Sequence, residues 1–484
     1  MTKLRLEKIA LIVAAFCLGT AAASSAQTFT SLASFNSPNG SYPSGALVQG
    51  FDGNLYGTTE NNAVFYEGGT VFVMTPAGAI TTLHNLSISD GGIPTALVLN
   101  GNGTFFGTAC CGTTSNWGAA FSIGARGKFN VLYSYDSASG SPNSALLAAN
   151  GEYYGTTLNG GTTDSGTVFE MTPAGARTTL YNFCTQPNCA DSGDPGSLIQ
   201  ASDGNFYGTS IGGVSASPYG TVFQLTPAGT LTTVYSFCAQ SGCSDGFWPF
   251  GLVQAEDGDL YGTTEFGGLT YTLCWFNGPS GCGTIFKISP TGTFTSLYIF
   301  CTQGGNSCPD EGLPVGPMIQ ATDGNFYGTT SGLQNVICQP TSTSGCGTIF
   351  KMTPGGQLTT LHTFDRTDGW EPGALVQATD GNFYGTTSDG GANDSGTAFK
   401  LSMGLGPFVK LVPRSGHVGQ TGAILGQGFT GTSSVSVNGT PSSFIVVSDT
   451  LIQATVPAGA TSGFVTVDTP SGTLKSNVVF RVLP

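Results

Sequence analysis

Residues 374–387 read ALVQATDGNFYGTT, and GTAF follows at residues 396–399. The same frame recurs along the chain around a central aromatic residue. In order, that residue is Tyr56, Phe106, Tyr154, Tyr207, Tyr261, Tyr327 and Tyr384. The spacings between them are 50, 48, 53, 54, 66 and 57 residues. A recurring period of this size is typical of repeat architectures, so the repeat decides the fold.

One repeat is predicted to contain four short strands. The first two are the ALVQ and FYGTT runs, joined by Asp380-Gly381, because Asp-Gly is a strong signal for a two-residue hairpin turn. The third strand begins at GTAF and ends, in most repeats, in a TPAG turn such as residues 75–78. The fourth is an LTTLYSF-type run of alternating polarity, as in residues 231–237 and 358–364.

Four antiparallel strands per repeat predict the blade of a β-propeller, and seven repeats predict seven blades. The seventh repeat ends near Gly404 without its fourth strand, whereas FTSLASF at residues 29–35 has the pattern of a fourth strand and precedes the first repeat. We therefore expect an all-β, seven-bladed propeller that the N-terminal strand closes. Closure is favourable because it leaves no open sheet edge.

The composition agrees with an all-β fold. The 484 residues include 74 Gly and 25 Pro, and only 9% are charged. Gly disfavours helices, whereas the abundant Thr and aromatic residues favour strands. The net charge of −14 argues against nucleic-acid binding, because an acidic surface repels phosphate backbones.

The first part of the chain has the pattern of a secretory signal peptide. Lys3, Arg5 and Lys8 precede an apolar run over residues 9–19, and small residues lead to a cleavage site before Gln27. Cleavage there changes the net charge to −16. No transmembrane segment is expected in the rest of the chain. We expect an exported protein, extracellular, periplasmic or at the cell surface, and the sequence leaves its oligomeric state open.

The blocks DGN-x-YGTT, GTVF with TPAG, and LTTLYSF resemble those of the GloVer tandem-repeat family of exported bacterial proteins. The resemblance covers about residues 28–404. It implies export and surface display, but no established activity or catalytic residue. Repeat 2 departs most from the pattern: residues 101–109 read GNGTFFGTA, and residues 124–127 replace TPAG. We expect blade 2 to be irregular.

Both the repeat and the cysteines end before the last part of the chain. Six short β-type runs follow, at residues 422–425, 434–437, 444–447, 451–456, 463–467 and 478–482. They predict a small β-sandwich. The segments GHVGQTGAILGQGF, SVSVNGT and PSGTLKSNVVFRV resemble an IPT/TIG domain, an immunoglobulin-like fold, which implies a spacer or contact surface. The predicted domains are the signal peptide at 1–26, the propeller at 27–404 and the IPT/TIG domain at 405–484.

Strand alternation places short, uniform turns on one face of the propeller and longer, variable loops on the other. All cysteines of the mature chain lie in the variable loops. Cys110 and Cys111 are open to two interpretations, a vicinal disulfide or two thiols. For the others the simplest pairing is within a loop, which suits an exported protein and leaves no thiolate for a metal. The expected bridges are Cys184–Cys189, Cys238–Cys243, Cys274–Cys282, Cys301–Cys308 and Cys338–Cys346.

All four tryptophans also lie on the variable face. Exposed Trp side chains stack on sugar rings or anchor protein partners, and the structural alternative is that each packs over its own loop. The loops that lead into the first strand carry Asp-Gly-x-x-Pro patterns, whose carboxylates either shape a turn or bind a ligand. The candidate ligand-binding residues are Trp117, Trp248, Trp275, Trp370, Asp245, Asp368 and Glu371.

Groups suited to catalysis are scarce. His84 and His362 replace strand tyrosines, and His417 lies in the C-terminal domain, so neither a Ser-His-Asp arrangement nor a zinc site is expected. First-strand glutamines are expected to form a neutral polar ring in the central channel. They are Gln49, Gln200, Gln254, Gln320 and Gln377. Paired loop carboxylates leave a glycoside hydrolase or lyase open, and the candidates are Glu60, Glu265, Asp368 and Glu371.

These features favour an exported, non-catalytic recognition or adhesion protein. It would bind a glycan or a surface protein through the variable, disulfide-stapled face. No cofactor and no metal are expected. The alternatives are a carbohydrate-active enzyme that uses the same face and a purely structural envelope protein.

Overall fold

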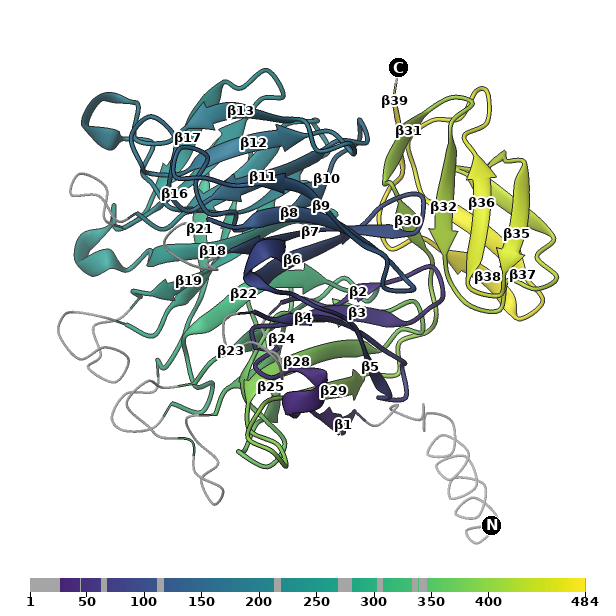
Figure 1. Ribbon diagram of the computed structural model, residues 1–484, viewed down its shortest axis with the longest axis horizontal. Helices are drawn as coiled ribbons and strands as arrows, with labels where there is room; N and C mark the ends of the chain where they lie inside the picture. The colour runs from purple at the N-terminus through teal and green to yellow at the C-terminus, as the bar shows by residue number, and fades with distance from the viewer. Residues whose placement is uncertain are drawn as a thin grey trace, which may run out of the picture.

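The computed structural model describes residues 27–43, 45–61, 68–110, 117–212, 219–268, 281–302, 308–332, 338 and 346–483. The predicted signal peptide, Cys111, Cys274 and Trp275 lie outside these residues. In the described part, strands alternate with turns, and the helical elements are single 3-10 turns. These turns are η1 (Ser37–Asn39), η2 (Ile88–Asp90), η3 (Pro187–Cys189) and η4 (Ser241–Cys243). The predicted all-β class is confirmed (Figure 1).

Each repeat forms one antiparallel sheet in which the strands pair in sequence order. Sheet 1 contains β2 (Val48–Gln49), β3 (Leu55–Thr59), β4 (Thr70–Met74) and β5 (Ile80–Asn85). Sheets 2 to 6 repeat this order. Their strands are β6 (Ile93–Leu99), β7 (Thr104–Cys110), β8 (Ala119–Gly124) and β9 (Phe129–Ser134); β10 (Leu146–Leu147), β11 (Tyr153–Thr157), β12 (Thr167–Met171) and β13 (Arg177–Asn182); β14 (Pro195–Gln200), β15 (Phe206–Ser210), β16 (Thr221–Leu225) and β17 (Leu231–Ser236); β18 (Phe247–Gln254), β19 (Leu260–Phe266), β20 (Thr284–Ile288) and β21 (Phe294–Ile299); β22 (Pro314–Gln320), β23 (Phe326–Thr330), β24 (Thr348–Met352) and β25 (Leu358–Thr363).

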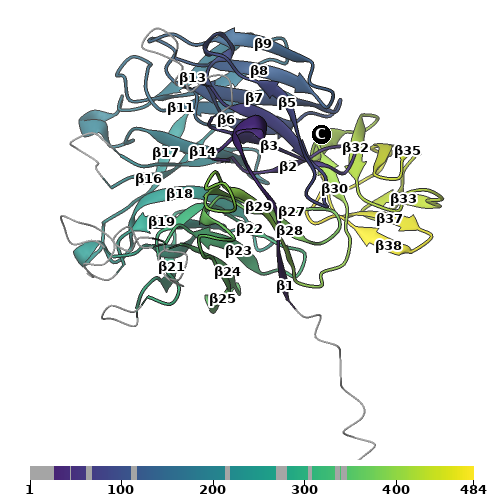
Figure 2. The ribbon, with the colours of Figure 1, turned by 60° about the horizontal axis from the view of Figure 1, so that its bottom comes forward.

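Sheet 7 joins the two ends of the repeat region. Its first strand is divided into β26 (Trp370–Pro372) and β27 (Val376–Gln377), followed by β28 (Phe383–Asp389) and β29 (Thr397–Ser402). The fourth position is filled by β1 (Thr28–Ser34), which pairs antiparallel with β29. The N-terminal strand therefore takes the place that the sequence predicts for it. Figure 2 shows the sheets following one another around a common centre, which is a propeller-like arrangement.

The repeated motif is explained by contacts between the second and third strands. In sheet 1, the Phe72 ring lies against Gly57 of YGTT, so that a Cβ on this glycine would be 2.9 Å from Phe72 Cε1. The Thr59 and Thr70 hydroxyls are 2.8 Å apart and buried. The same Gly–Phe contact recurs in all seven sheets. YGTT and GTVF are therefore one packing unit divided between two strands.

The DGN turn is held by its own aspartate. Asp52 Oδ2 accepts hydrogen bonds from Asn54 Nδ2 at 2.7 Å and from the Tyr56 hydroxyl at 2.9 Å. Sheets 4, 6 and 7 have the same network. The Asp, Asn and Tyr of the motif are consequently structural.

Consecutive sheets touch through a glycine and a proline. A Cβ on the glycine that precedes the third strand would lie 2.5 to 2.9 Å from the Cδ of a proline at the first strand of the next sheet, so only glycine allows this approach. The pairs are Gly69–Pro94, Gly118–Pro142, Gly166–Pro195, Gly220–Pro249, Gly283–Pro314, Gly347–Pro372 and Gly396–Pro43. The last pair joins sheet 7 to sheet 1.

The first-strand glutamines do not form the predicted polar ring in the channel. Each side-chain oxygen instead accepts a hydrogen bond from a backbone N–H in the hairpin turn of the preceding sheet. Each side-chain nitrogen donates to the glycine carbonyl in the hairpin turn of its own sheet. The glutamines thereby satisfy backbone groups that the turns leave without partners. The backbone donors are Ala149 to Gln200, Ser202 to Gln254, Glu256 to Gln320, Thr322 to Gln377 and Thr379 to Gln49, at 2.7 to 3.1 Å.

The expected irregularity of repeat 2 is wrong. Strands β6 to β9 form a four-stranded sheet, with β7 paired to β8 over six residues. Gly103 and Gly127 have φ values of 84° and 82°, close to the 80° of Gly53 in sheet 1, so both turns keep their shape. Ala109 and Ala119 replace the buried threonine pair with methyl groups. The substitutions change the side chains and leave the backbone path intact.

The C-terminal part is a separate β-sandwich. One sheet has the order β30-β32-β36-β35, the other β34-β33-β37-β38, and β31 pairs parallel with β39. The strands are β30 (Lys410–Val412), β31 (Ser415–His417), β32 (Thr421–Leu425), β33 (Ser434–Val437), β34 (Thr440–Pro441), β35 (Phe444–Ser448), β36 (Leu451–Thr455), β37 (Val465–Thr469), β38 (Gly472–Lys475) and β39 (Arg481–Leu483). Its core includes Val409, Ile424, Phe429, Ile452 and Val467.

This sandwich packs against the hairpin-turn end of sheets 1 and 2 (Figure 1). Leu425 and Leu451 share a buried cluster with Tyr56 and Phe105. The Thr450 hydroxyl donates to the Phe51 carbonyl at 2.7 Å. The opposite ends of the paired strands β3 and β4, at Thr59 and Thr70, lead toward the variable side of sheet 1 and away from this contact.

Candidate binding site at the cavity mouth

A cavity of about 470 Å³ lies where the first strands of the sheets meet. Six of the seven sheets contribute to its wall, through residues that follow the contact prolines by one to three positions. They include Ala46, Thr95, Asn143, Ser197, Val315 and Ala374. Most lining side chains are small, and Glu371 is the charged residue among them. The cavity is therefore a narrow central space that opens toward the variable loops.

The residues just before the contact prolines precede these lining segments along the chain, and one of them, Glu371, is itself part of the lining. In five sheets such a residue is not glycine and still has a positive φ, between 51° and 59°. These five, called the mouth residues below, are Tyr42, Asp194, Trp248, Leu313 and Glu371. Each backbone N–H donates to a carbonyl in the preceding sheet, in the loop between its second and third strands. Examples are Tyr42 to Ser395 at 3.0 Å and Trp248 to Tyr219 at 2.9 Å.

The mouth residues share one backbone geometry but differ in side chain. A left-handed conformation costs a non-glycine residue of order 1 kcal/mol and persists only where neighbours impose it. Here the neighbours are the N–H···O=C bond and the Gly–Pro contact of the adjacent sheet. The frame thus holds tyrosine, tryptophan, leucine and two carboxylates at equivalent backbone positions. Among them, Leu313 is buried in the core and Glu371 lines the cavity.

Carboxylates gather on the side of the opening formed by sheets 7 and 1. Burial raises the pKa of the Glu371 carboxyl, and the nearby Asp389 and Glu60 raise it further. Burial also raises the pKa of Asp389, against the opposing effect of Arg366. Both carboxylates therefore stand in a partly desolvated, negatively charged environment that favours hydroxyl donors or cations.

A second acidic region lies on the sheet 4 and sheet 5 side. Burial raises the pKa of Glu265 to about 7, and burial raises the pKa of the Asp194 carboxyl as well. Glu265 lies in β19 at the repeat position that Glu60 has just after β3 of sheet 1. Of the candidate carboxylates, Glu371 has a carboxylate neighbour in Glu60, which raises its pKa.

The predicted tryptophans have different surroundings. Trp248 is a mouth residue whose ring lies 5.4 Å from Phe266 in an edge-on arrangement. Trp370 packs beside Phe364 and lies 5.8 Å from the Arg366 guanidinium. Trp117 is half-buried against the cluster around Phe169. Trp248 is accordingly the tryptophan at the mouth, while Trp275 lies outside the described residues.

The predicted loop aspartates hold turns. Asp245 is fully buried and accepts hydrogen bonds from the Tyr235 hydroxyl at 2.8 Å and the Ala239 N–H at 3.0 Å. Asp368 contacts His362 Nε2 at 2.9 Å and accepts from the Asp365 N–H at 2.8 Å. In these contacts both carboxylates shape a turn, which is one of the two roles that the sequence left open for them. They also explain why histidine can replace the strand tyrosine.

Four of the expected within-loop disulfides are present, with sequence separations of 5 to 8 residues: Cys184–Cys189, Cys238–Cys243, Cys301–Cys308 and Cys338–Cys346. Cys282 and Cys110 are disulfide-bonded too. The expected partner of Cys282 is Cys274, and both Cys274 and Cys111 lie outside the described residues. The loops around the mouth are therefore covalently stapled.

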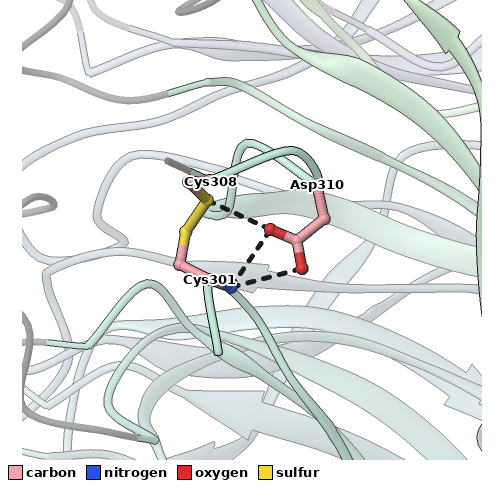
Figure 3. Close-up of side chains that lie close together, drawn as sticks. All are labelled: Cys301, Cys308 and Asp310. Atoms are coloured by element: carbon pink, nitrogen blue, oxygen red, sulfur yellow. Dashed lines mark hydrogen bonds between the residues drawn. A yellow bond between two sulfur atoms is a disulfide. The ribbon is translucent and has the colours of Figure 1, made fainter. Parts of the chain in front are cut away.

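One cluster combines two cysteines with a carboxylate (Figure 3). Cys308 Sγ lies 3.0 Å from Asp310 Oδ1. Because Cys301 and Cys308 form a disulfide, they have no thiolate to offer a metal. Asp310 accepts from the Tyr298 hydroxyl at 2.7 Å and from the Cys301 N–H at 3.0 Å. The cluster is a loop anchor of the same kind as Asp245.

Sequence reasoning missed three of the mouth residues, namely Tyr42, Asp194 and Leu313, together with the acidic neighbour Asp389. The three mouth residues share one signal in the sequence, which is that each directly precedes the proline at the first strand of its sheet. That position is visible in the sequence, but its positive φ is not. Among the described residues, no helix is long and apolar enough to cross a membrane.

The geometry defines an all-β repeat protein with a propeller-like repeat region and an immunoglobulin-like C-terminal domain. The model of the Gloeobacter/Verrucomicrobia repeat matches residues 19–147, 141–336 and 331–428, so the chain belongs to that family. The IPT/TIG domain matches residues 408–482. Both agree with the resemblances seen in the sequence. A search of curated proteins found no match.

Several solved structures are similar in fold. A fungal alcohol oxidase of the AA5 family, in complex with copper, has a TM-score of 0.51 and 14% identity over 94% of this chain and 99% of its own. The extracellular domain of the proposed hybrid two component system BT3049 from B. thetaiotaomicron has a TM-score of 0.48 and 11% identity, covering 94% of this chain and 58% of its own. At such identities the likeness concerns the fold alone.

Proposed function

We propose that this chain is an exported recognition protein that binds a glycan at the mouth of the central cavity. The observation that carries the proposal is the set of five mouth residues, which hold different side chains at equivalent backbone positions and of which Glu371 lines the 470 Å³ cavity. Strained non-glycine backbone of this kind clusters at ligand sites. Pockets with a few placed polar groups and aromatic walls suit small ligands.

The side chains at the mouth favour a sugar. Glu371, in the cavity lining, supplies an acceptor for sugar hydroxyls. Trp248 and Tyr42, at the equivalent positions of sheets 5 and 1, are half-buried aromatic residues that offer a face to a sugar ring. Burial and neighbouring carboxylates raise the pKa values of Glu371 and Asp389. The same carboxylates would repel an acidic sugar. A neutral or amino-bearing glycan fits this chemistry better than a uronate or sulfated one.

The architecture we propose for this function is a seven-bladed propeller over residues 27–404, closed by β1, followed by the IPT/TIG domain at 405–484, after cleavage of a signal peptide at 1–26. Seven Gly–Pro contacts and the β1–β29 pairing support the closed ring. The disulfides support export, because such bonds persist in oxidising compartments.

A glycan array probed with residues 27–484 tests the proposal. We expect binding of a neutral or amino sugar ligand that falls at least tenfold in Trp248→Ala and in Glu371→Gln. Trp117→Ala is the matched control, because Trp117 packs against the cluster around Phe169 and is not a mouth residue. Equal losses in all three variants would contradict a site at the mouth.

The carbohydrate-active enzyme is distinguished by product release. Glu60 is near enough to raise the pKa of Glu371, and a paired-carboxylate hydrolase would need two neighbouring carboxylates of this kind. We expect no new reducing ends when the protein is incubated with its bound glycan. Turnover that Glu371→Gln abolishes would replace recognition by hydrolysis, and absence of both binding and turnover would leave the structural envelope role.

A further inference from the structure

The inner face of the C-terminal domain places basic residues against the repeat region. Val409 and Leu411 lie in the core of the sandwich, so Lys410 and Val412 of β30 lie on the opposite face. Val412 packs on the buried cluster at the hairpin-turn end of sheets 1 and 2. Lys410 therefore faces that end of the repeat region, and Arg414, two residues beyond β30, is near enough to lower the pKa of Lys410.

A third cation joins them from β39. The Arg481 N–H donates to the Arg414 carbonyl at 3.0 Å, where β39 runs beside β31. The Arg481 guanidinium reaches the hairpin turn of sheet 4, because a Cβ on Gly204 would lie 3.0 Å from its Nη1. Pro413, next to Arg414, lies 4.0 Å from the corresponding position of Gly101 in sheet 2. Arg481 and the segment that contains Arg414 thus lie beside the turns of two separate sheets.

These cations have no acidic partner within the described residues. The Lys and Arg ion pairs found there, within 4.0 Å, belong to Lys287, Lys351 and Arg366. Burial lowers the pKa of Lys410 to about 8, with Arg414 adding to the effect, and burial also lowers the pKa of Arg414. Solvent nevertheless reaches the Arg414 side chain, which is exposed.

The aspartates of the nearby turns are already occupied. Asp203 accepts hydrogen bonds from the Asn205 N–H at 3.0 Å and the Tyr207 hydroxyl at 3.0 Å, within its own turn. Asp52 and Asp380 have the same local partners. Clustered cations without a counter-charge are unfavourable in a partly desolvated place, and a bound anion would remove that cost.

We propose that Lys410, Arg414 and Arg481 form an oxyanion-binding site between the C-terminal domain and the hairpin-turn end of the repeat region. Its ligand is a tetrahedral oxyanion, either inorganic sulfate or phosphate or the sulfate ester of a polysaccharide. Arginine pairs of this kind recognise such groups through several N–H donors at once. The site is separate from the mouth and has the opposite charge preference.

Titration calorimetry with inorganic sulfate and phosphate, on residues 27–484 in sodium chloride of matched ionic strength, tests this site. We expect saturable binding that weakens at least tenfold in Arg414→Gln and in Arg481→Gln and is partly restored in Arg414→Lys. Arg126→Gln is the control, because Arg126 is an exposed arginine in a turn of sheet 2. A sulfated oligosaccharide that binds more tightly than free sulfate would identify the polymer as the source.

Either of two binding results, or a third result from melting temperatures, would overturn the proposal. One is the absence of saturable anion binding, together with a melting temperature that responds equally to sulfate and chloride. The other is a loss in Arg126→Gln as large as that in Arg414→Gln. If Arg414→Gln lowers the melting temperature equally with and without sulfate, the cations only hold the domain in place. Because these readouts do not involve the mouth, they are independent of glycan binding.

Discussion

The side-chain oxygen of Gln49 accepts a hydrogen bond from the backbone N–H of Thr379, 3.0 Å away although the residues are 330 positions apart. Gln377 accepts in the same way from Thr322 at 3.1 Å, between two sheets that are consecutive in sequence. Each amide nitrogen also donates to the neighbouring threonine hydroxyl at 3.0 Å. The contact between the last and first sheets is therefore equivalent to a contact within the chain.

This equivalence predicts equal costs for two substitutions. Gln49→Ala and Gln377→Ala should each lower the free energy of unfolding by about 1–3 kcal/mol, because each leaves buried backbone and hydroxyl groups without a partner. Chemical denaturation of both variants measures the difference. A neutral Gln49→Ala beside a costly Gln377→Ala would mean that the ring is open in solution.

Removal of the N-terminal strand should have a larger effect. Deletion of residues 27–36 takes away the strand that pairs with β29 and the fully buried Phe35. We expect loss of cooperative unfolding of the repeat region, since loss of the Phe35 side chain alone should cost about 3–5 kcal/mol. Calorimetry of the deleted protein gives the answer, and an unchanged melting profile would refute closure by β1.

The Gly–Pro contacts predict a steric effect that can be separated from backbone strain. Gly396 has a φ of 94°, and a Cβ there would lie 2.6 Å from Pro43 Cδ. Gly151 has a similar φ of 83°, with nothing within 4 Å of its Cβ position. Gly396→Ala should therefore destabilise the protein by at least about 1–3 kcal/mol more than Gly151→Ala, through overpacking. Equal costs in urea unfolding would show that the contact is loose.

Glu265 predicts a dependence of stability on pH. Burial raises its pKa from 4.5 to about 7, so between these values the folded state binds more protons than the unfolded state. The free energy of unfolding should therefore fall as pH rises from about 4.5 to about 7, by roughly 2 kcal/mol from this group. Glu265→Gln should flatten this decline, and exposed Glu256→Gln should leave it in place. Melting temperatures across this range decide between them.

Much of the fold follows from local chemistry that a sequence displays. Asp-Gly turns and the YGTT and GTVF blocks are self-contained, since Gly57 with Phe72 and Asp52 with Tyr56 interact within one repeat. The seventh repeat lacks a fourth strand, and one strand of that type precedes the first repeat, so counting the strands was enough to assign β1 to sheet 7. Repeat 2 was misjudged because its side chains differ from the pattern, whereas the backbone requirement, positive φ at Gly103, is met.

The site was less accessible to prediction because it depends on contacts between repeats. Trp248 and Glu371 were identified by residue type, but Asp245 and Asp368 were grouped with them although their carboxylates hold turns. Nothing in a single repeat reveals that the residue before the proline is forced to positive φ by the adjacent sheet. The glutamine side chains likewise turn toward a neighbour that sequence patterns cannot place.

The position of β1 also has a mechanical consequence. It is the outermost strand of sheet 7 and the first strand of the chain, so tension applied at the N-terminus acts directly on the strand that fastens the ring. Force applied at the C-terminus instead reaches the immunoglobulin-like domain first. A molecule tethered at its N-terminus would therefore open at a defined seam when pulled, whereas one held at its C-terminus would keep that seam unloaded.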